Sequence, residues 1–138
     1  HLFYKYIKID IEQFAILEDN FPSELDEIHF QTSAQFDYDK EQYLLCSKLT
    51  VTLSASEKPI LKTVICSYFS IKKESVEQII NEKGQLIFAP PTLVQFASLN
   101  YGSLRGVLYL KTQGSKLENY ILPPIFFGQI IDKSFVVD

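Results

Sequence analysis

The residues best suited to chemistry are few and far apart. The chain has two histidines, His1 and His29, and two cysteines, Cys46 and Cys66. A cysteine nucleophile needs a nearby base, and a zinc site needs about four ligands. His1 is terminal, His29 falls on the polar side of a strand pattern, and neither is close in sequence to a cysteine. We therefore predict no catalytic residue and no metal site, and expect two free thiols inside strands.

Familiar catalytic and nucleotide-binding motifs are also missing. The sequence has no Gly-x-Gly-x-x-Gly, no phosphate-binding loop and no Gly-x-Ser-x-Gly. The carboxylates of Asp10, Glu12, Glu18 and Asp19 fall at exposed positions of their patterns, where they solubilise the chain. These observations predict a protein that is not an enzyme and uses no cofactor.

Composition narrows the class of partner. The chain has 138 residues, enough for one domain, and a net charge of −4, which does not attract nucleic acid or anionic lipid. No apolar run reaches the roughly 18 residues of a membrane span. The lack of a cysteine framework favours a reducing compartment, so we expect a cytoplasmic protein. Because the chain begins His1-Leu2-Phe3 and contains no Met, we also expect that a short N-terminal piece has been removed.

The first half of the chain has the alternating pattern of β-strands. Alternation marks four runs, residues 6–16, 28–37, 43–54 and 60–71. The first run slips in phase after Ile11, which predicts a β-bulge near Gln13. Turns are expected at 37–40 and 55–58, and the fourth run is apolar on both faces, as in a strand with a layer on each side.

The second half changes to helical patterns. Ser75 can cap a short helix that ends at Ile80, and Pro90 and Pro91 open a longer one over residues 92–110. A short apolar helix is expected over 125–131. Strands followed by helices predict a single α+β domain, residues 1–138, with a four-stranded antiparallel sheet, a long helix and a short C-terminal helix.

The long helix has two distinct stripes. The predicted core stripe consists of Leu93, Phe96, Ala97, Leu104, Val107, Leu108 and Lys111. Ser98, Gly102 and Gly106 form a neighbouring stripe of small residues. Each interior glycine costs about 1 kcal/mol relative to alanine. The glycines therefore either kink the helix or leave a flat face that another helix or a sheet can approach.

Apolar surface exceeds what one small sheet can cover. Aromatic residues make up 14% of the chain, and the fourth strand, the glycine stripe and the Phe126-Phe127 pair all need partners. Surplus apolar surface indicates self-association or a binding groove. A groove for extended peptide needs a strand edge and aromatic pockets beside it. An ordinary core with a dimer interface remains the alternative.

Five segments, in order, resemble the SecB family of export chaperones. They are 6–11 (Tyr-Ile-Lys-Ile-Asp-Ile), 49–55 (Leu-Thr-Val-Thr-Leu-Ser-Ala), 68–71 (Tyr-Phe-Ser-Ile), 101–108 (Tyr-Gly-Ser-Leu-Arg-Gly-Val-Leu) and 122–125 (Leu-Pro-Pro-Ile). They stand where that family has its first, third and fourth strands, its long helix, and the loop before its short helix. The likeness covers nearly the whole chain and implies a SecB-like fold.

The resemblance also implies a function. SecB-like proteins are cytosolic chaperones, built as a dimer of dimers, that hold unfolded polypeptide for export. By position, the subunit contacts would include Ser98, Gly102, Arg105 and Gly106. The peptide groove would be lined by Tyr68, Phe69, Tyr120, Phe126 and Phe127, for each of which a core role is the alternative.

The resemblance further implies docking to the SecA motor through acidic residues of the sheet. Asp10 and Glu12 could stand for two of them. Lys62 occupies a position where the family is acidic, and like charges across an interface weaken binding. A chaperone devoted to one client therefore fits equally well. Two other classes stay open: an adaptor subunit that only oligomerises, and a domain that binds a small molecule or lipid in the same groove.

Overall fold

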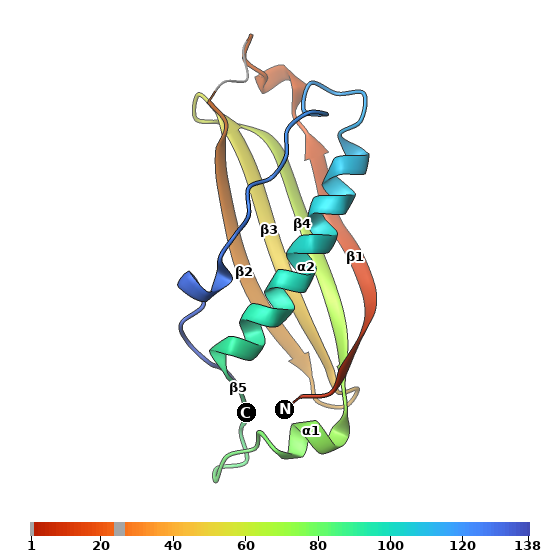
Figure 1. Ribbon diagram of the computed structural model, residues 1–138, viewed down its shortest axis with the longest axis vertical. Helices are drawn as coiled ribbons and strands as arrows, with labels where there is room; N and C mark the ends of the chain where they lie inside the picture. The colour runs from red at the N-terminus through yellow and green to blue at the C-terminus, as the bar shows by residue number, and fades with distance from the viewer. Residues whose placement is uncertain (1, 24–26) are drawn as a thin grey trace.

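A four-stranded antiparallel sheet forms the body of the protein (Figure 1). The computed structural model describes residues 2–23 and 27–138. The strands pair in the order β1-β4-β3-β2. Their bounds are β1 Tyr4–Ile16, β2 His29–Asp39, β3 Leu44–Ala55 and β4 Lys58–Ile71. The predicted α+β class, with the sheet first and the helices after it, is confirmed.

Bulges and turns determine which side chains of these strands lie on each face of the sheet. The pairing of β1 with β4 shifts between Ile11 and Gln13, so the predicted bulge is confirmed, and it shifts again between Tyr6 and Lys8. β3 and β4 are joined by the two-residue turn Ser56-Glu57, with φ of 50° and 66°, the hand that suits a tight hairpin. The turn expected at 37–40 begins later, because β2 continues to Asp39.

The long helix lies close to its predicted position, and the two short helices differ from the prediction. α2 runs from Pro90 to Lys111, with proline in its first turn. α1 is shorter than predicted, Lys73–Glu77, and Ser75 is not its cap: its Oγ accepts the N–H of Phe3 at 2.9 Å. The expected helix over 125–131 is reduced to one 3₁₀ turn, η2, Phe127–Gln129. The remaining elements are η1, Glu18–Asn20, and a small second sheet of β5, Leu86–Phe88, and β6, Phe135–Val137.

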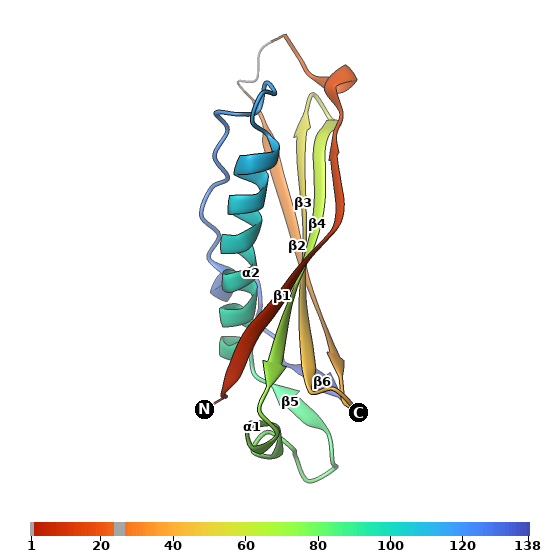
Figure 2. The same cartoon turned by 90° about the vertical axis from the view of Figure 1, so that its right-hand side faces the viewer.

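The core lies between α2 and one face of the sheet. Figure 2 shows α2 and the segment after it on the same side of the strands. Wholly or almost wholly buried residues on this side include Leu49, Val51, Leu53, Leu61 and Ile65 from the sheet and Ala97, Leu104 and Leu108 from the helix. A second cluster forms around Phe69, Phe88 and Phe96.

The assignment of one residue, Lys111, to the core stripe of the long helix is wrong. Lys111 is exposed, and its ammonium lies 5.3 Å from the centre of the Phe14 ring. Val107 is only half-buried, whereas Asn100 and Tyr101 are buried. The buried face of α2 is therefore centred nearer to Asn100 than the sequence pattern predicts. The sheet beneath Asn100 provides hydrogen-bond partners for its side chain.

The opposite face of the sheet has no helix across it in the part of the chain that the structure describes (Figure 2). On β2 and β3 this face carries polar side chains, with Gln31 and Ser33 on β2 beside Thr52 and Thr50 on β3. Among residues 2–23 and 27–138, no helix is long and apolar enough to cross a membrane.

Candidate functional site

A groove of about 400 Å³ lies between α2 and the chain that follows it. We call it the helix groove; its lining residues are Gly102, Arg105, Gly106, Leu108, Tyr109, Tyr120, Ile121 and Leu122. One wall is the C-terminal half of α2, and the other is the extended segment around Tyr120. In Figure 1 that segment runs back along the helix, on the same face of the sheet.

The extended wall is fixed to the core. Leu117, Leu122 and Phe127 are at most 3% exposed. The hydroxyl of Tyr101 donates to the carbonyl of Pro123, and the Tyr101 ring meets Phe127 edge-on at 5.8 Å. Burial raises the pKa of Tyr101 to about 12, so this donor keeps its proton at neutral pH. The helix groove is therefore formed before anything binds in it.

The floor of the helix groove is open above the glycines. A Cβ added to Gly102 or Gly106 would meet nothing within 4 Å. α2 continues through both positions, so the glycines do not break the helix. Ser98 and Arg105 are exposed on the same stretch of α2, and the Arg105 guanidinium lies 5.9 Å from the centre of the Tyr101 ring. Among the residues that the structure describes, nothing lies over Gly102 and Gly106, which agrees with the flat face, one of the two alternatives left open by the sequence.

Large exposed apolar side chains line the groove or lie near it in sequence. Tyr109, 57% exposed, and Ile121, 72% exposed, are lining residues. Leu110, 72% exposed, follows Tyr109, and Phe126, 70% exposed, lies four residues after Leu122. Single exposed apolar residues are ordinary, but residues that gather around a groove mark an interaction site. The sequence pattern did not single out Tyr109 or Ile121. They come together only because the segment after α2 folds back along it.

The five predicted peptide-binding aromatics do not share one surface. Tyr120 lines the helix groove and Phe126 is exposed. Phe69 is fully buried against Phe96, with ring centres 4.5 Å apart, and Phe127 is 2% exposed under Tyr101. These two are core residues, because Phe69 lies on the helix side of β4 and η2 turns Phe127 inward. Tyr68 lies on the other face of the sheet, beside the cysteines.

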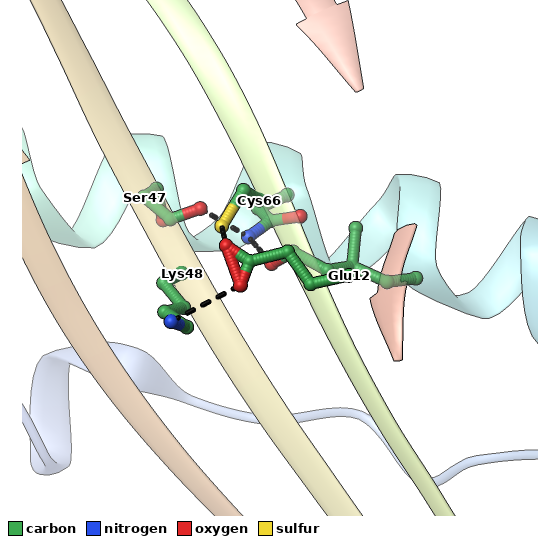
Figure 3. Close-up of polar contacts among 6 residues, drawn as sticks. Glu12, Ser47, Lys48 and Cys66 are labelled. Carbon is green, nitrogen blue, oxygen red and sulfur yellow. Dashed lines mark hydrogen bonds and ion pairs between the residues drawn. The ribbon is translucent and has the colours of Figure 1, made fainter. Parts of the chain in front are cut away.

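That other face has its own depression, of about 580 Å³, which we call the sheet-face pocket. Figure 3 shows the Glu12 carboxylate between Lys48 and Cys66. Lys48 Nζ lies 3.1 Å from Glu12 Oε2, and Cys66 Sγ donates to Glu12 Oε1 at 3.0 Å. Glu12 lies two residues after Asp10, which is paired with Cys66, and at the register shift between Ile11 and Gln13. The thiol and the ammonium together lower the pKa of Glu12.

The sheet-face pocket is poorly suited to nucleophilic chemistry. Burial, followed by the hydrogen bond to Glu12, raises the pKa of the Cys66 thiol, and burial also raises that of Cys46. Burial raises the pKa of Tyr68 to about 12. A thiol attacks only as its thiolate. At neutral pH both sulfurs are therefore protonated, as expected of cysteines with a structural role.

The predicted docking residues lie on this face as well. Asp10 is paired with Cys66 across β1 and β4, next to Glu12. Lys48 already compensates the charge of Glu12, and Lys62 is exposed two positions before Val64 on β4. A basic partner would therefore meet two lysines as well as the two carboxylates.

Comparisons with known proteins support the architecture. No protein-family model and no curated protein matches the sequence. Among solved structures, the chain resembles a SecB-like chaperone of Mycobacterium tuberculosis, solved in complex with a ChAD peptide from the HigA1 antitoxin. The TM-score is 0.59 at 14% identity, over 88% of this chain and 89% of that one.

A second solved structure is more distant. It is a protein of unknown function from Streptococcus agalactiae, with a TM-score of 0.49 at 11% identity, over 91% of this chain and 99% of that one. The first match covers most of both chains, and on that ground the chain has a SecB-like fold.

Proposed function

We propose that this protein is a chaperone that binds unfolded, extended polypeptide. The observation that carries the proposal is the helix groove: its extended wall is fixed to the core, and two large apolar side chains that line it, Tyr109 and Ile121, are exposed among the residues that the structure describes. Extended chains expose apolar side chains that a native protein hides. A rigid apolar groove recovers the hydrophobic free energy of those side chains at little ordering cost to itself.

The fold supports the proposal. The similar Mycobacterium tuberculosis protein is a SecB-like chaperone and was solved with a peptide bound. A peptide-binding role for the present chain is compatible with that architecture. Within the predicted set, Tyr120 and Phe126 are the residues we assign to client contact. Phe127 supports the wall of the groove from below, and Phe69 supports the sheet.

We also propose that the protein is a homo-oligomer, a dimer or a tetramer, through the α2 face of Ser98, Gly102, Arg105 and Gly106. Support comes from the open space above the glycines and from Leu99, which is 38% exposed on the same helix. Gly102, Arg105 and Gly106 belong to the helix groove as well. A second copy and a client would therefore share or compete for this part of α2.

Delivery of clients to SecA for export is a separate proposal. It rests on Asp10 and Glu12, and the lysines beside them oppose it. A cytoplasmic chaperone devoted to one client needs no such docking site. Binding of the purified protein to SecA, compared between wild type and Lys62→Glu, separates the two roles.

A second candidate function has one observation in its favour. A groove of about 400 Å³ is within the size range of small-molecule sites, roughly 300–1,000 Å³. Native mass spectrometry of the purified protein would detect a retained small molecule or lipid.

The proposed function is tested by suppression of aggregation. A model protein that unfolds on reduction, such as α-lactalbumin, is reduced with and without this protein at about equal molar amounts. The proposal predicts that wild type keeps the reduced protein soluble and that Tyr120→Ser with Phe126→Ser does not. Aggregation at the same rate with and without wild type would exclude the chaperone role.

A further inference from the structure

The two cysteines, far apart in sequence, come together at the sheet-face pocket. Cys46 on β3 and Cys66 on β4 are both free thiols and both line this pocket. In the register of β3 with β4, Cys46 is paired with Tyr68, and Lys48 with Cys66. The cysteines are therefore diagonal neighbours on the same face of the sheet. Cys46 is half-buried and Cys66 is 1% exposed.

The spacing of the two cysteines does not suit a disulfide. Diagonal neighbours across an antiparallel pair lie about 7–8 Å apart, whereas a disulfide needs Cα atoms within about 6.8 Å. The thiols nevertheless affect each other. Burial is the main cause of the raised pKa of each, and the other cysteine contributes to both shifts. The gap between the sulfurs is therefore better suited to an atom that bonds to both of them than to an S–S bond.

The available ligands decide which ion could lie between the sulfurs. Among residues 2–23 and 27–138, no group of three or more His, Cys, Asp and Glu side chains is placed to hold a metal ion. Zinc takes about four ligands, and Ca²⁺ or Mg²⁺ takes six or more, mostly oxygen, so these ions have no site there. Cu(I) is a soft ion that prefers sulfur, and two thiolates in a line satisfy it. The prediction of no metal site was based on the ligand number of zinc.

The charged neighbours of the thiols also suit Cu(I). A metal binds sulfur only after the thiol has lost its proton. Cys66 Sγ already donates to Glu12 Oε1 at 3.0 Å, so a carboxylate is in place to receive that proton (Figure 3). Asp37 lines the same pocket and, with Glu12, favours the entry of a cation. Lys48 Nζ, 3.1 Å from Glu12 Oε2, offsets the negative charge left by the two thiolates.

We propose that the sheet-face pocket binds one Cu(I) ion between the sulfurs of Cys46 and Cys66. Two S–H bonds are lost and two Cu–S bonds form. Two protons leave, that of Cys66 by way of Glu12, and no electron is transferred. Cys46 is the sulfur that an ion from solvent reaches first, because Cys66 is the more deeply buried of the two.

This site goes beyond the proposed function and is independent of it. The helix groove lies on the other face of the sheet and shares no lining residue with the sheet-face pocket. A protein that binds Cu(I) but no unfolded polypeptide would therefore keep this inference and lose the proposed function. A protein that binds unfolded polypeptide but no Cu(I) would do the reverse.

The test is competition for Cu(I) with bicinchoninate, a chelator that is coloured only when it holds Cu(I). The protein is reduced, freed of reductant and titrated without oxygen. Wild type should withdraw one equivalent of Cu(I), with the ultraviolet absorption typical of a copper thiolate. Cys46→Ser and Cys66→Ser should each weaken binding about 100-fold or more, because each removes one of the two bonds to the ion.

A matched control is Gln35→Ala. Gln35 lines the same pocket but offers no sulfur, so this variant should bind Cu(I) within about twofold of wild type. Circular dichroism and thermal unfolding check that the variants fold. If the buried Cys66→Ser does not fold, Cys46→Ser still decides the question, because Cys46 is only half-buried.

Three results would overturn the inference. The first is equal affinity of wild type and Cys46→Ser for Cu(I), which would mean that one sulfur holds the ion alone. The second is binding of several equivalents with no dependence on either cysteine, which would mean nonspecific uptake. The third is Zn²⁺ binding as tight as that of Cu(I), measured with a coloured zinc chelator, which would require more ligands than the two sulfurs.

Discussion

Asn100, buried in the middle of α2, accepts a hydrogen bond from the hydroxyl of Ser67 on β4 at 2.8 Å. Its amide nitrogen donates to the carbonyls of Ser47 at 2.7 Å and Ile65 at 3.1 Å. One polar side chain therefore ties the helix to two strands. Ser67 is bonded in turn to the hydroxyl of Tyr6. Since buried polar groups need specific partners, these bonds fix where α2 lies along the sheet, and with it the helix groove.

Replacement of Asn100 by alanine should lower the free energy of unfolding by about 2 kcal/mol, because it leaves buried groups without partners. Chemical denaturation measures the change. Ser98→Ala, two residues away on the exposed side, should stay within about 0.5 kcal/mol of wild type. Equal effects of the two substitutions would show that the polar contact does not hold the layers together.

Phe126 and Phe127 are neighbours with opposite environments, 70% and 2% exposed. Phe127→Ala should lower the free energy of unfolding by about 3–5 kcal/mol, the usual cost of removing a buried phenylalanine. Phe126→Ala should leave stability within about 0.5 kcal/mol and weaken the binding of unfolded polypeptide by fivefold or more. Denaturation and anisotropy measure the two effects.

If Phe126→Ala destabilised the fold instead, or left client affinity unchanged, its assignment to client contact would be wrong. Phe3→Ala is a suitable control for client binding, because Phe3 is also a large exposed residue, 58%, but lies just before β1, at the other end of the chain from Tyr120 and Phe126. It should not alter client affinity.

Substitution of Gly102 and Gly106 should have different effects on subunit assembly and on the stability of α2. Alanine at both positions meets no atom within 4 Å and should stabilise the helix by up to about 1 kcal/mol each in the isolated chain. If another subunit approaches this face closely, the same substitutions should lower the molecular mass found by light scattering. A rise in thermal stability with no change in mass would contradict the proposed interface.

The Glu12–Lys48 pair predicts a pH dependence with a definite sign. The pKa of Glu12 in the folded state is below its ordinary value of 4.5. The paired carboxylate therefore stabilises the fold above about pH 4.5, and this stabilisation is lost as the pH falls through the lowered pKa. The pair is about one-third exposed, so the effect is small and decreases with added salt.

Thermal unfolding of wild type and Glu12→Gln over pH 2 to 8 tests this sign. The two proteins should differ at pH 7 and converge in acid. Glu18→Gln, exposed in η1, serves as the control and should parallel wild type throughout. A difference that grows toward low pH would contradict the assignment.

The strands were predictable because alternation is a local property of the sequence. The bulge near Gln13 could be read from a slip in that alternation, and the 55–58 turn from its small and charged residues. Phe69 could also have been assigned to the core, since it shares its side of the fourth strand with Leu61 and Ile65.

Other features depend on contacts between distant segments. The burial of Asn100 reflects carbonyls that the sheet presents to it, which a helical pattern does not show. The helix groove exists because the chain after Lys111 returns along α2 and is held there by Tyr101 and Pro123. The reduction of the last predicted helix to η2 follows from the same path, with Phe127 turned inward instead of continuing a helix.

The most direct test of polypeptide binding compares two forms of one ligand. Reduced, carboxymethylated α-lactalbumin is permanently unfolded, and the disulfide-bonded native form has the same chain. Titration of wild type against each, by isothermal calorimetry, should give saturable binding to the unfolded form and none to the native one. Equal binding to both forms, or to neither, would contradict the account.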